Sequence, residues 1–473
     1  MRAEPFDKLR TAAVEAHVFR QAQGPAPRAP QRQTPCGRCA VMWGMTAGAL
    51  TKLGYPIVEH TLENGLRVIS SPDHIAPSVA VNIWYDVGSR DEEQGRTGFA
   101  HLFEHVMFQG SAHVASGQHI ALLQAAGAVV NATTWFDRTN YFETLPTGGL
   151  DLALWLEADR MATLLDALTQ ENLDNQREVV KEEKRQRYDN VPYGDVMELL
   201  NTLTFPPDHP YGHTTIGSMD DLDAATLEDV HSFFRRHYVP NNAVLSIVGD
   251  VEPEDAFERA EVYFGRMPAG SKPGKPEARP MEPLSGMPRT EASDKVPADA
   301  VYFSWRLPAR DSRDFDALDL AFSILGHGQT SRLHKQLVRG TEHAEGTGAS
   351  AMGLIGGNSF GFSYARARDG VSPEQLEEEM SELIAQLVSD GPTDEELRRA
   401  KAQFERHWLH ELARVDSRAD ALGEYATLHG SPHLINSRIA EITAIDEEDL
   451  QSAMQQWFGP DQRATLIYRQ EAS

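Results

Sequence analysis

The sequence predicts an α+β protein made of two homologous domains, each a mostly antiparallel sheet packed with helices. Three observations support this prediction. Strand-like and helix-like patterns follow the same order in both halves of the 473-residue chain, a Pro/Gly-rich linker over residues 267–296 separates the halves, and two short landmarks recur at nearly equal displacements. Duplication of a domain of roughly 200 residues explains all three observations.

Residues 1–50 lie outside the repeated pattern. They are rich in Pro, Gln and Arg and show no regular apolar periodicity, which predicts a disordered tail. Both cysteines of the chain, Cys36 and Cys39, lie in this tail. Their C-x-x-C spacing has no second pair to complete a zinc site, so we expect neither a metal site nor a disulfide framework there.

Composition narrows the classes of partner. Hydrophobic residues make up 41% of the chain and charged residues 24%, as in ordinary globular proteins. A net charge of −26 disfavours nucleic acid and anionic membranes as partners. No apolar run approaches the roughly 20 residues that cross a bilayer. The N-terminus also lacks the apolar core of a signal peptide, so we expect a cytoplasmic protein with no membrane partner.

The first domain is expected over residues 55–266. It opens with a hairpin, in which the alternating segments 56–62 and 66–69 flank a turn at Asn64-Gly65. Beyond the hairpin, helices are predicted where apolar residues recur three and four apart, and strands where short apolar runs are bounded by turn residues. These elements are strands over 79–85 and 243–248 and helices over 150–168, 171–188 and 227–237.

The second domain is expected over residues 297–470. Its first predicted elements are a strand over 301–305 and a helix over 316–325. Thr169 and Thr393 begin matching helical segments that are displaced by 224 residues, and Glu228 and Glu448 begin a second matching pair displaced by 220. Displacements so nearly equal favour duplication over coincidence.

The segment with the strongest chemical signal covers residues 98–110, whose apolar residues predict a largely buried helix ending at Gly110. His101 and His105 are four residues apart, so both imidazoles project from one face and can meet one metal ion. Zinc suits such a site, because imidazoles and a carboxylate can leave its fourth position open to water. Glu104 lies one turn from His101, where it can accept a proton from that water and direct its attack on a carbonyl.

A third protein ligand has to come from another segment. Glu183 follows Val179 by four residues and Val180 by three, so it shares their inward face on the helix predicted over 171–188. Glu182 shares a face with polar residues and is expected to be solvated. Two rival ligands lie in a Pro/Gly-containing loop, His209 and His213.

Residues 127–137 have the composition of a strand bounded by a glycine and a polar turn. At a sheet edge beside the metal, such a strand can pair with an extended peptide through backbone hydrogen bonds. An ordinary internal strand explains the composition equally well, so the sequence leaves both readings open.

These segments resemble the pitrilysin family of zinc metallopeptidases, and the resemblance extends from about residue 55 to residue 470. It is carried by the motif His101-Leu-Phe-Glu104-His105, the glutamate helix around Glu183 and the strand that contains Asn131 and Ala132. The resemblance implies a pitrilysin-like fold in its short two-domain form and one zinc ion per chain. It also implies that His101, His105 and Glu183 ligate the zinc ion and that Glu104 is the general base.

The resemblance also implies how substrate binds. Asn131 and Ala132 are expected to bind the peptide backbone by strand addition. Two short subunits are expected to close around a chamber that admits peptides or small unfolded proteins. The function expected from the sequence is therefore that of a zinc-dependent metalloendopeptidase acting inside a dimer. The alternative is a non-catalytic structural or binding subunit of a related protease or processing complex.

The sequence departs from the family pattern at two positions. Gln176 stands seven residues before Glu183, where the family often has an acidic residue. Arg339 matches a substrate-binding arginine of the second domain, but Gly346 occupies the position of a tyrosine that grips substrate. We therefore expect a related subunit without a metal site as a dimer partner.

The second domain carries no metal motif. The helix predicted over 316–325 corresponds to the one over 98–110. Its residues at the positions of His101, Glu104 and His105 are Asp319, Phe322 and Ser323.

Overall fold

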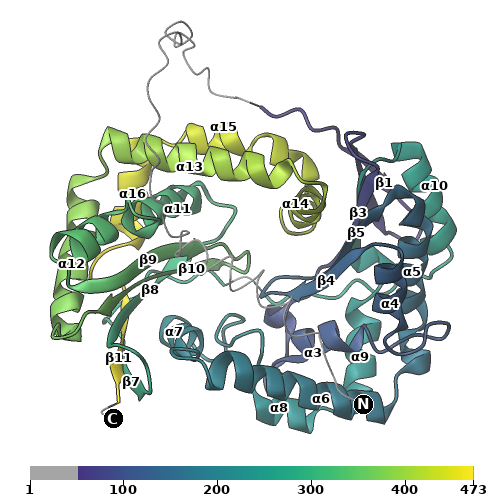
Figure 1. Cartoon of the computed structure of the whole chain (residues 1–473), viewed down its shortest axis with the longest axis horizontal. Coiled ribbons are helices and arrows are strands. Elements are labelled where there is room, and N and C mark those ends of the chain that lie inside the picture. The colour runs from purple at the N-terminus through teal and green to yellow at the C-terminus, as the bar shows by residue number, and fades with distance from the viewer. Residues whose placement is uncertain (1–51, 278, 472–473) are drawn as a thin grey trace, which may run out of the picture.

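The computed structural model describes residues 52–277 and 279–471. Figure 1 shows two halves, each a sheet with helices packed against it, and helix α14 (Val415–Leu428) between them. The predictions for the tail, disorder over residues 1–50 and no site at Cys36 and Cys39, fall outside the described residues.

The first sheet has six strands within the described residues, in the order β1-β2-β6-β3-β5-β4. β2 and β6 run parallel, and all other neighbours run antiparallel. This order places β4 at one edge. The strands are β1 (Val58–Thr61), β2 (Arg67–Pro72), β3 (Ser78–Tyr85), β4 (Val129–Thr134), β5 (Thr139–Pro146) and β6 (Ala243–Gly249).

The second sheet repeats the first. Its described strands follow the order β7-β11-β8-β10-β9, and only β7 and β11 run parallel. When β1 is set aside, both sheets have the same order and the same parallel pair, which confirms the predicted α+β fold with two homologous domains. The strands are β7 (Arg289–Asp294), β8 (Ala300–Pro308), β9 (Ala344–Met352), β10 (Asn358–Ala367) and β11 (Ala464–Gln470). β7 falls inside the range 267–296 assigned to a linker, so the second sheet begins earlier than the sequence indicated.

Helices flank both sheets. Those of the first half are α3 (Phe99–Val106), α4 (Gln118–Ala125), α5 (Leu150–Ala167), α6 (Gln170–Lys184), α7 (Val196–Thr204), α8 (Met219–Ala224), α9 (Leu227–His237) and α10 (Pro253–Phe264). Those of the second half are α11 (Arg313–Gly326), α12 (Pro373–Asp390), α13 (Asp394–Leu412), α14, α15 (Arg438–Thr443) and α16 (Glu447–Trp457). α6 continues as a π-helical segment over Arg185–Asp189, and a second π-helical segment covers His334–Gly340.

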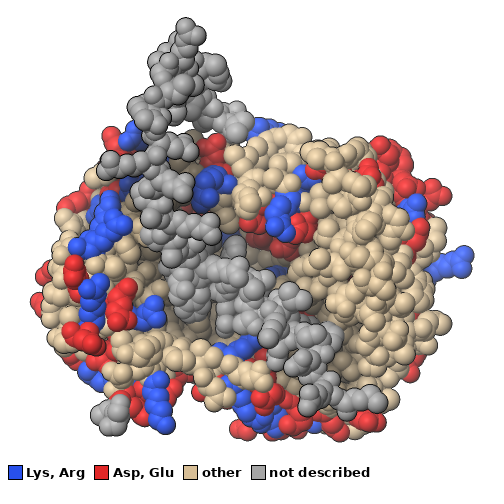
Figure 2. All heavy atoms as spheres, in the orientation of Figure 1, with Lys and Arg blue, Asp and Glu red and all other residues tan. Residues whose placement is uncertain are grey.

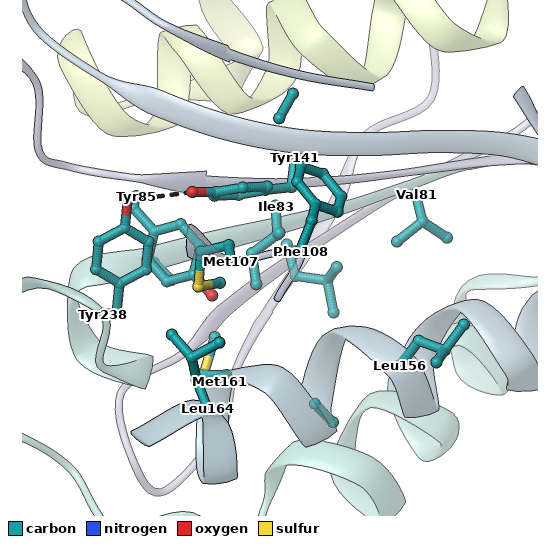
Figure 3. Close-up of a cluster of buried hydrophobic side chains, with 14 of the residues drawn as sticks. Val81, Ile83, Tyr85, Met107, Phe108, Tyr141, Leu156, Met161, Leu164 and Tyr238 are labelled. Atoms are coloured by element: carbon teal, nitrogen blue, oxygen red, sulfur yellow. Dashed lines mark hydrogen bonds between the residues drawn. The ribbon is translucent and has the colours of Figure 1, made fainter. Parts of the chain in front are cut away.

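The main core of the first half lies between its sheet and α3 and α5. Alternation along β3 directs Val81, Ile83 and Tyr85 to this face, where each is at most 1% exposed. Figure 3 shows these side chains facing apolar residues of α5, and the hydroxyls of Tyr141 and Tyr238 hydrogen-bonded at 3.2 Å. Each large side chain buried here stabilises the fold by roughly 1.5–3 kcal/mol. The core therefore holds α3 firmly against the sheet.

The two halves exchange one helix each. α14 belongs to the second half but packs on the other face of the first sheet, where Leu422 joins a buried cluster with Trp84. A Cβ atom at Gly423 would lie 2.4 Å from Cδ1 of Trp84, so this close approach needs a glycine. α7 belongs to the first half but packs on the second sheet, where Leu200 is buried with Tyr302. Each sheet is therefore covered partly by the other half of the chain.

Charged side chains are unevenly distributed on the face shown in Figure 2. Acidic and basic residues are interspersed over the half built on the second sheet, whereas residues of other kinds cover most of the half built on the first. Within residues 52–277 and 279–471, no helix combines the length and the apolar character that a bilayer crossing requires.

Candidate metal centre

The start of α3 is fixed by contacts from outside the helix. Gly98 precedes the helix with a φ of 88°, and a Cβ atom there would lie 2.7 Å from the carbonyl oxygen of Ile216. The buried carboxylate of Glu92 accepts hydrogen bonds from the backbone N–H groups of Gly98 (2.9 Å) and Ala100 (2.8 Å). These N–H groups have no partner inside the helix, so Glu92 caps it from the preceding loop.

Three donor groups converge where α3 meets α6. Nε2 of His101 lies 3.7 Å from Oε1 of Glu183, and Nε2 of His105 lies 3.1 Å from Oε2 of the same carboxylate. The two imidazole rings stand at 81° to each other. One donor atom from each residue lies within 4.8 Å of the others, a spacing that one metal ion can bridge. Elsewhere in the described chain, no three His, Cys, Asp or Glu side chains are grouped in this way.

Burial and charge set the protonation of these groups. Burial lowers the pKa of His101, and Glu183 opposes this shift without cancelling it, so the neutral imidazole that binds metals is favoured. Burial raises the pKa of the Glu183 carboxyl. The close contact with His105 and the positive charge of Arg187 outweigh burial and bring that pKa below its usual range. The carboxylate is therefore ionised and can ligate a cation.

The donor set fits a zinc ion. Nε2 of His105 is buried and, among the described residues, has no hydrogen-bond partner even though Glu183 lies 3.1 Å away. A buried ring nitrogen without a partner is costly unless another group satisfies it. A metal ion between the imidazoles and the carboxylate satisfies this nitrogen, and the two His and one Glu match the ligand set of catalytic zinc sites.

Glu104 lies on α3 beside these donors and is 7% exposed. Its Oε2 accepts a hydrogen bond of 2.8 Å from Oγ1 of Thr134, the last residue of β4. The same strand contains Asn131 and the buried Ala132, the two residues expected to bind substrate. β4 pairs with β5 on one side and, in the described sheet, with no strand on the other. Of the two readings left open by the sequence, the edge strand is the one observed.

Thr134 and Arg187 are site residues that the sequence analysis did not identify. Arg187 lies on the π-helical segment after α6, and its Nη1 contacts Oε1 of Glu183. The spacing of four residues between Glu183 and Arg187 is a signal for this ion pair. Thr134 had no such signal, because its contact with Glu104 joins a strand to a helix distant in the sequence.

The rival ligands lie apart from the three donors. His209 stacks on Phe205, and its Nδ1 accepts the N–H of Tyr211 at 3.1 Å. Burial and the nearby Arg306 lower the pKa of His209 to about 4. Nδ1 of His213 lies 3.2 Å from the carbonyl oxygen of Thr214.

Glu183 was preferred to Glu182 because Val179 and Val180 were both expected to mark the inward face of α6. The expectation for Val179 is wrong. Val180 is fully buried, as expected, but Val179 is 41% exposed and does not mark that face. Glu182 is 53% exposed and bonds to Arg185, as expected of a solvated residue. The position three residues after Val180 is sufficient to turn Glu183 inward.

The second half places its corresponding residues differently. Phe322 is buried against Trp305, so an aromatic core contact stands where the first half has the Glu104 carboxylate. Burial raises the pKa of Asp319 to about 6. Arg339 is exposed and donates a hydrogen bond of 3.0 Å to Gln329, and Gly346 lies on β9. Ser323, the remaining counterpart, lies on α11.

Two family models match this chain. The family described as Insulinase (Peptidase family M16) matches residues 67–215, and the domain described as the Peptidase M16 inactive domain matches residues 224–404. The first range contains His101, Glu104, His105 and Glu183. The second lies largely in the half where the described residues hold no comparable cluster.

Individual proteins agree with the family models. Zinc protease PqqE of Helicobacter pylori is 30% identical over 423 residues, which cover 86% of this chain and 92% of that protein. A crystal structure of a protease from Helicobacter pylori superposes with a TM-score of 0.82 at 28% identity, covering 88% of this chain and 99% of that one. The fold also superposes on the periplasmic protease PqqL from Escherichia coli with a TM-score of 0.71 at 19% identity. It covers 93% of the first half of PqqL but 48% of the whole. This chain therefore belongs to peptidase family M16, as its resemblance to the pitrilysin family predicted, and it has the short two-domain form of that family.

Proposed function

We propose that this chain is a zinc-dependent endopeptidase that hydrolyses peptides or small unfolded proteins. The observation that carries the proposal is the convergence of His101, His105 and Glu183, with the Glu104 carboxylate on the same helix. Relatives named as zinc proteases support it. Zinc, when bound, supplies a Lewis acid that polarises a peptide carbonyl and makes a water molecule more acidic.

The residues of the chain bind the metal and transfer the proton. His101, His105 and the ionised Glu183 would hold the zinc ion, while Arg187 contacts one oxygen of Glu183 and limits how that carboxylate can turn. Glu104 accepts a proton from the attacking water and returns it to the leaving amine. The hydrogen bond from Thr134 orients Glu104 for this role.

The edge strand β4 is the proposed binding strand for the peptide backbone. Asn131 and Ala132 lie on it two to three residues before Thr134, which contacts Glu104. A peptide that adds to this edge is held extended through backbone hydrogen bonds, with little dependence on its side chains. The arrangement suits an enzyme acting on unfolded segments.

A second two-domain subunit is proposed to complete a chamber around the substrate. PqqL is about twice as long as the part that superposes here, so that protein carries a second part of similar length in the same polypeptide. Gly346 provides no side chain to reach a substrate, and we propose that a related subunit without a metal site is the partner. Mass spectrometry of the native complex, with zinc quantified, measures which subunits the complex contains and how many zinc ions it binds. A fully active enzyme that contains this polypeptide alone contradicts the related-subunit proposal.

The test of the catalytic proposal separates metal binding from chemistry. We expect the wild-type protein to bind one zinc ion per chain and to cleave a quenched fluorescent peptide, and to lose cleavage when a chelator removes zinc. Glu104→Gln should keep zinc and lose cleavage by at least about a hundredfold, because general-base catalysis is removed. His105→Ala should lose both, because one metal ligand is deleted.

The alternative is a non-catalytic subunit of a related protease complex. A wild-type protein that binds zinc and peptide but cleaves no peptide, alone or with its partner, supports that alternative and refutes catalysis. Unchanged cleavage by Glu104→Gln refutes the assigned base.

A further inference from the structure

Arg366, on β10 of the second sheet, has a guanidinium group that no acidic side chain of the described residues pairs with. It is half-buried, its Nε is fully buried without a hydrogen-bond partner, and it forms no ion pair with any residue in the described ranges. The chain has 70 acidic and 44 basic residues, so acidic side chains are available in excess to form ion pairs with arginines. A partly desolvated cation without a counter-charge is destabilising, so its retention points to a ligand outside the chain.

Two glycines of β9 leave room for this side chain. Across the β9–β10 pair, Arg366 faces Gly346 and Tyr364 faces Gly348. A Cβ atom at Gly346 would lie 3.2 Å from Nη2 of Arg366, and one at Gly348 would lie 2.6 Å from Cε1 of Tyr364. The Arg366 and Tyr364 side chains therefore lie across the backbone of β9, which is the last strand of the described sheet. The guanidinium is presented at that edge.

Aromatic rings form the adjoining wall on the same sheet face. The rings of Tyr302 and Tyr364 are stacked with centroids 5.8 Å apart, and Tyr193 contacts Tyr302 at 6.4 Å. Burial raises the pKa of Tyr364, and the charge of Arg366 works against that rise, which indicates that the two groups are close. Tyr193 follows Glu183 by ten residues, so the segment leaving the metal helix reaches this wall.

We propose that Arg366 is an anchor for a carboxylate of the bound peptide. The planar guanidinium accepts a carboxylate in a bidentate manner, and neighbouring aromatic rings reduce the competition from water. This inference rests on the proposed peptidase function and names a feature of the substrates that it prefers. The carboxylate can come from the C-terminus of the peptide or from an Asp or Glu side chain, which present the same group.

The test measures peptide binding rather than cleavage. Short fluorescein-labelled peptides are titrated into the zinc-loaded Glu104→Gln protein, and fluorescence anisotropy is recorded. One peptide has a free C-terminus and one internal Glu, a second is C-terminally amidated, and a third has Gln in place of Glu. We expect removal of one of these carboxylates to weaken binding about tenfold, which corresponds to about 1.4 kcal/mol, because a charge-assisted hydrogen bond is lost. The peptide that weakens identifies the source of the carboxylate.

Variants connect that difference to Arg366. The Arg366→Ala change should abolish the discrimination, and Arg366→Lys should reduce it to about threefold or less, because lysine keeps the charge without the fork. Arg368→Ala is the matched control, since Arg368 is exposed and paired with Glu342, and it should retain the full difference. The Lys variant decides the matter if the Ala variant does not fold. Equal binding of all three peptides, or discrimination that survives in the Arg366 variants, overturns the proposal. Absence of cleavage by zinc-loaded wild type refutes the catalytic function separately, because these titrations do not depend on turnover.

Discussion

At the scale of single residues, two adjacent glutamates on α6 have opposite environments. Glu183 is 14% exposed and lies at the two imidazoles, whereas Glu182 is 53% exposed and bonds to Arg185 and Gln186. We expect Glu183→Gln to lose zinc, since a neutral amide is a much weaker ligand than a carboxylate. Glu182→Gln is the matched control and should keep zinc and activity. Zinc per chain by atomic absorption and cleavage of a quenched peptide check both variants, and a zinc-loaded Glu183→Gln protein contradicts the ligand assignment.

The residues of the site differ in how far the sequence could predict them. His101, Glu104 and His105 sit within one helix, where spacing alone places them on a common face. Glu183 could be predicted through its position on its own helix, although not its distance from His105. Arg366 carried no signal, because an unpaired side chain is recognised only when its spatial neighbours are known.

At the scale of elements, the Glu396 carboxylate stabilises the start of α13 in two ways, by capping the helix and by pairing with Arg332. Glu396 accepts hydrogen bonds from Thr393 N–H at 2.9 Å and from Arg332 at 3.0 and 2.8 Å. Burial raises the pKa of Glu396, but the bonds from Arg332 and Thr393 outweigh it and lower the pKa to about 2. The folded-state pKa lies below that of the unfolded chain, so this stabilisation is complete above about pH 5 and is lost as pH falls towards 2.

A single substitution tests this pH dependence. We expect Glu396→Gln to lower the free energy of unfolding by about 1–2 kcal/mol at pH 7, and the difference from wild type to shrink as pH falls from 5 towards 2. Glu395→Gln is the control, because Glu395 is 79% exposed. Urea unfolding across this pH range measures both. A difference that stays constant with pH contradicts the assignment of the shifted carboxyl.

Element boundaries were predictable where local signals mark them. α9 covers the predicted residues 227–237 because Thr226 and Asp229 form a capping box at its start. β7 was missed because Arg289–Asp294 is polar and has no buried residue, so no apolar alternation marks it. α6 was predicted to run to residue 188, but its last part is π-helical, a change of winding with no simple sequence signal.

At the scale of the whole molecule, the repeated sheet order followed from the duplicated sequence pattern, but the exchange of helices did not. The apolar residues of α14 predict only that one face is buried, not that it is buried against the opposite half. That choice also depends on polar contacts. Asp420 of α14 accepts hydrogen bonds from Asn82 (3.1 Å), Trp84 (3.0 Å) and Asn140 (2.8 Å) of the first sheet. These partners lie more than 270 residues away along the chain, beyond the reach of local patterns.

The exchange predicts that neither half folds alone. Dividing the chain after Pro276, in the exposed segment that joins the two halves, gives two fragments for separate expression, 52–276 and 277–471. The first fragment lacks α14 and exposes Trp84, and the second lacks α7 and exposes Tyr302. We expect each fragment alone to show no cooperative thermal transition and to bind a hydrophobic dye. The co-expressed pair should co-elute and melt in one transition, because each sheet regains the helix that covers it.

The control for this prediction is the full chain cut at the same bond after folding, by a protease site inserted there. It should stay associated and melt close to the intact protein, because cutting removes no buried contact. Circular dichroism and size-exclusion chromatography measure all four samples. If fragment 52–276 alone melts cooperatively near the temperature of the intact chain, the face of the first sheet under α14 does not need that cover. The two halves are then independent domains, and the exchange contributes to their orientation rather than to their folding.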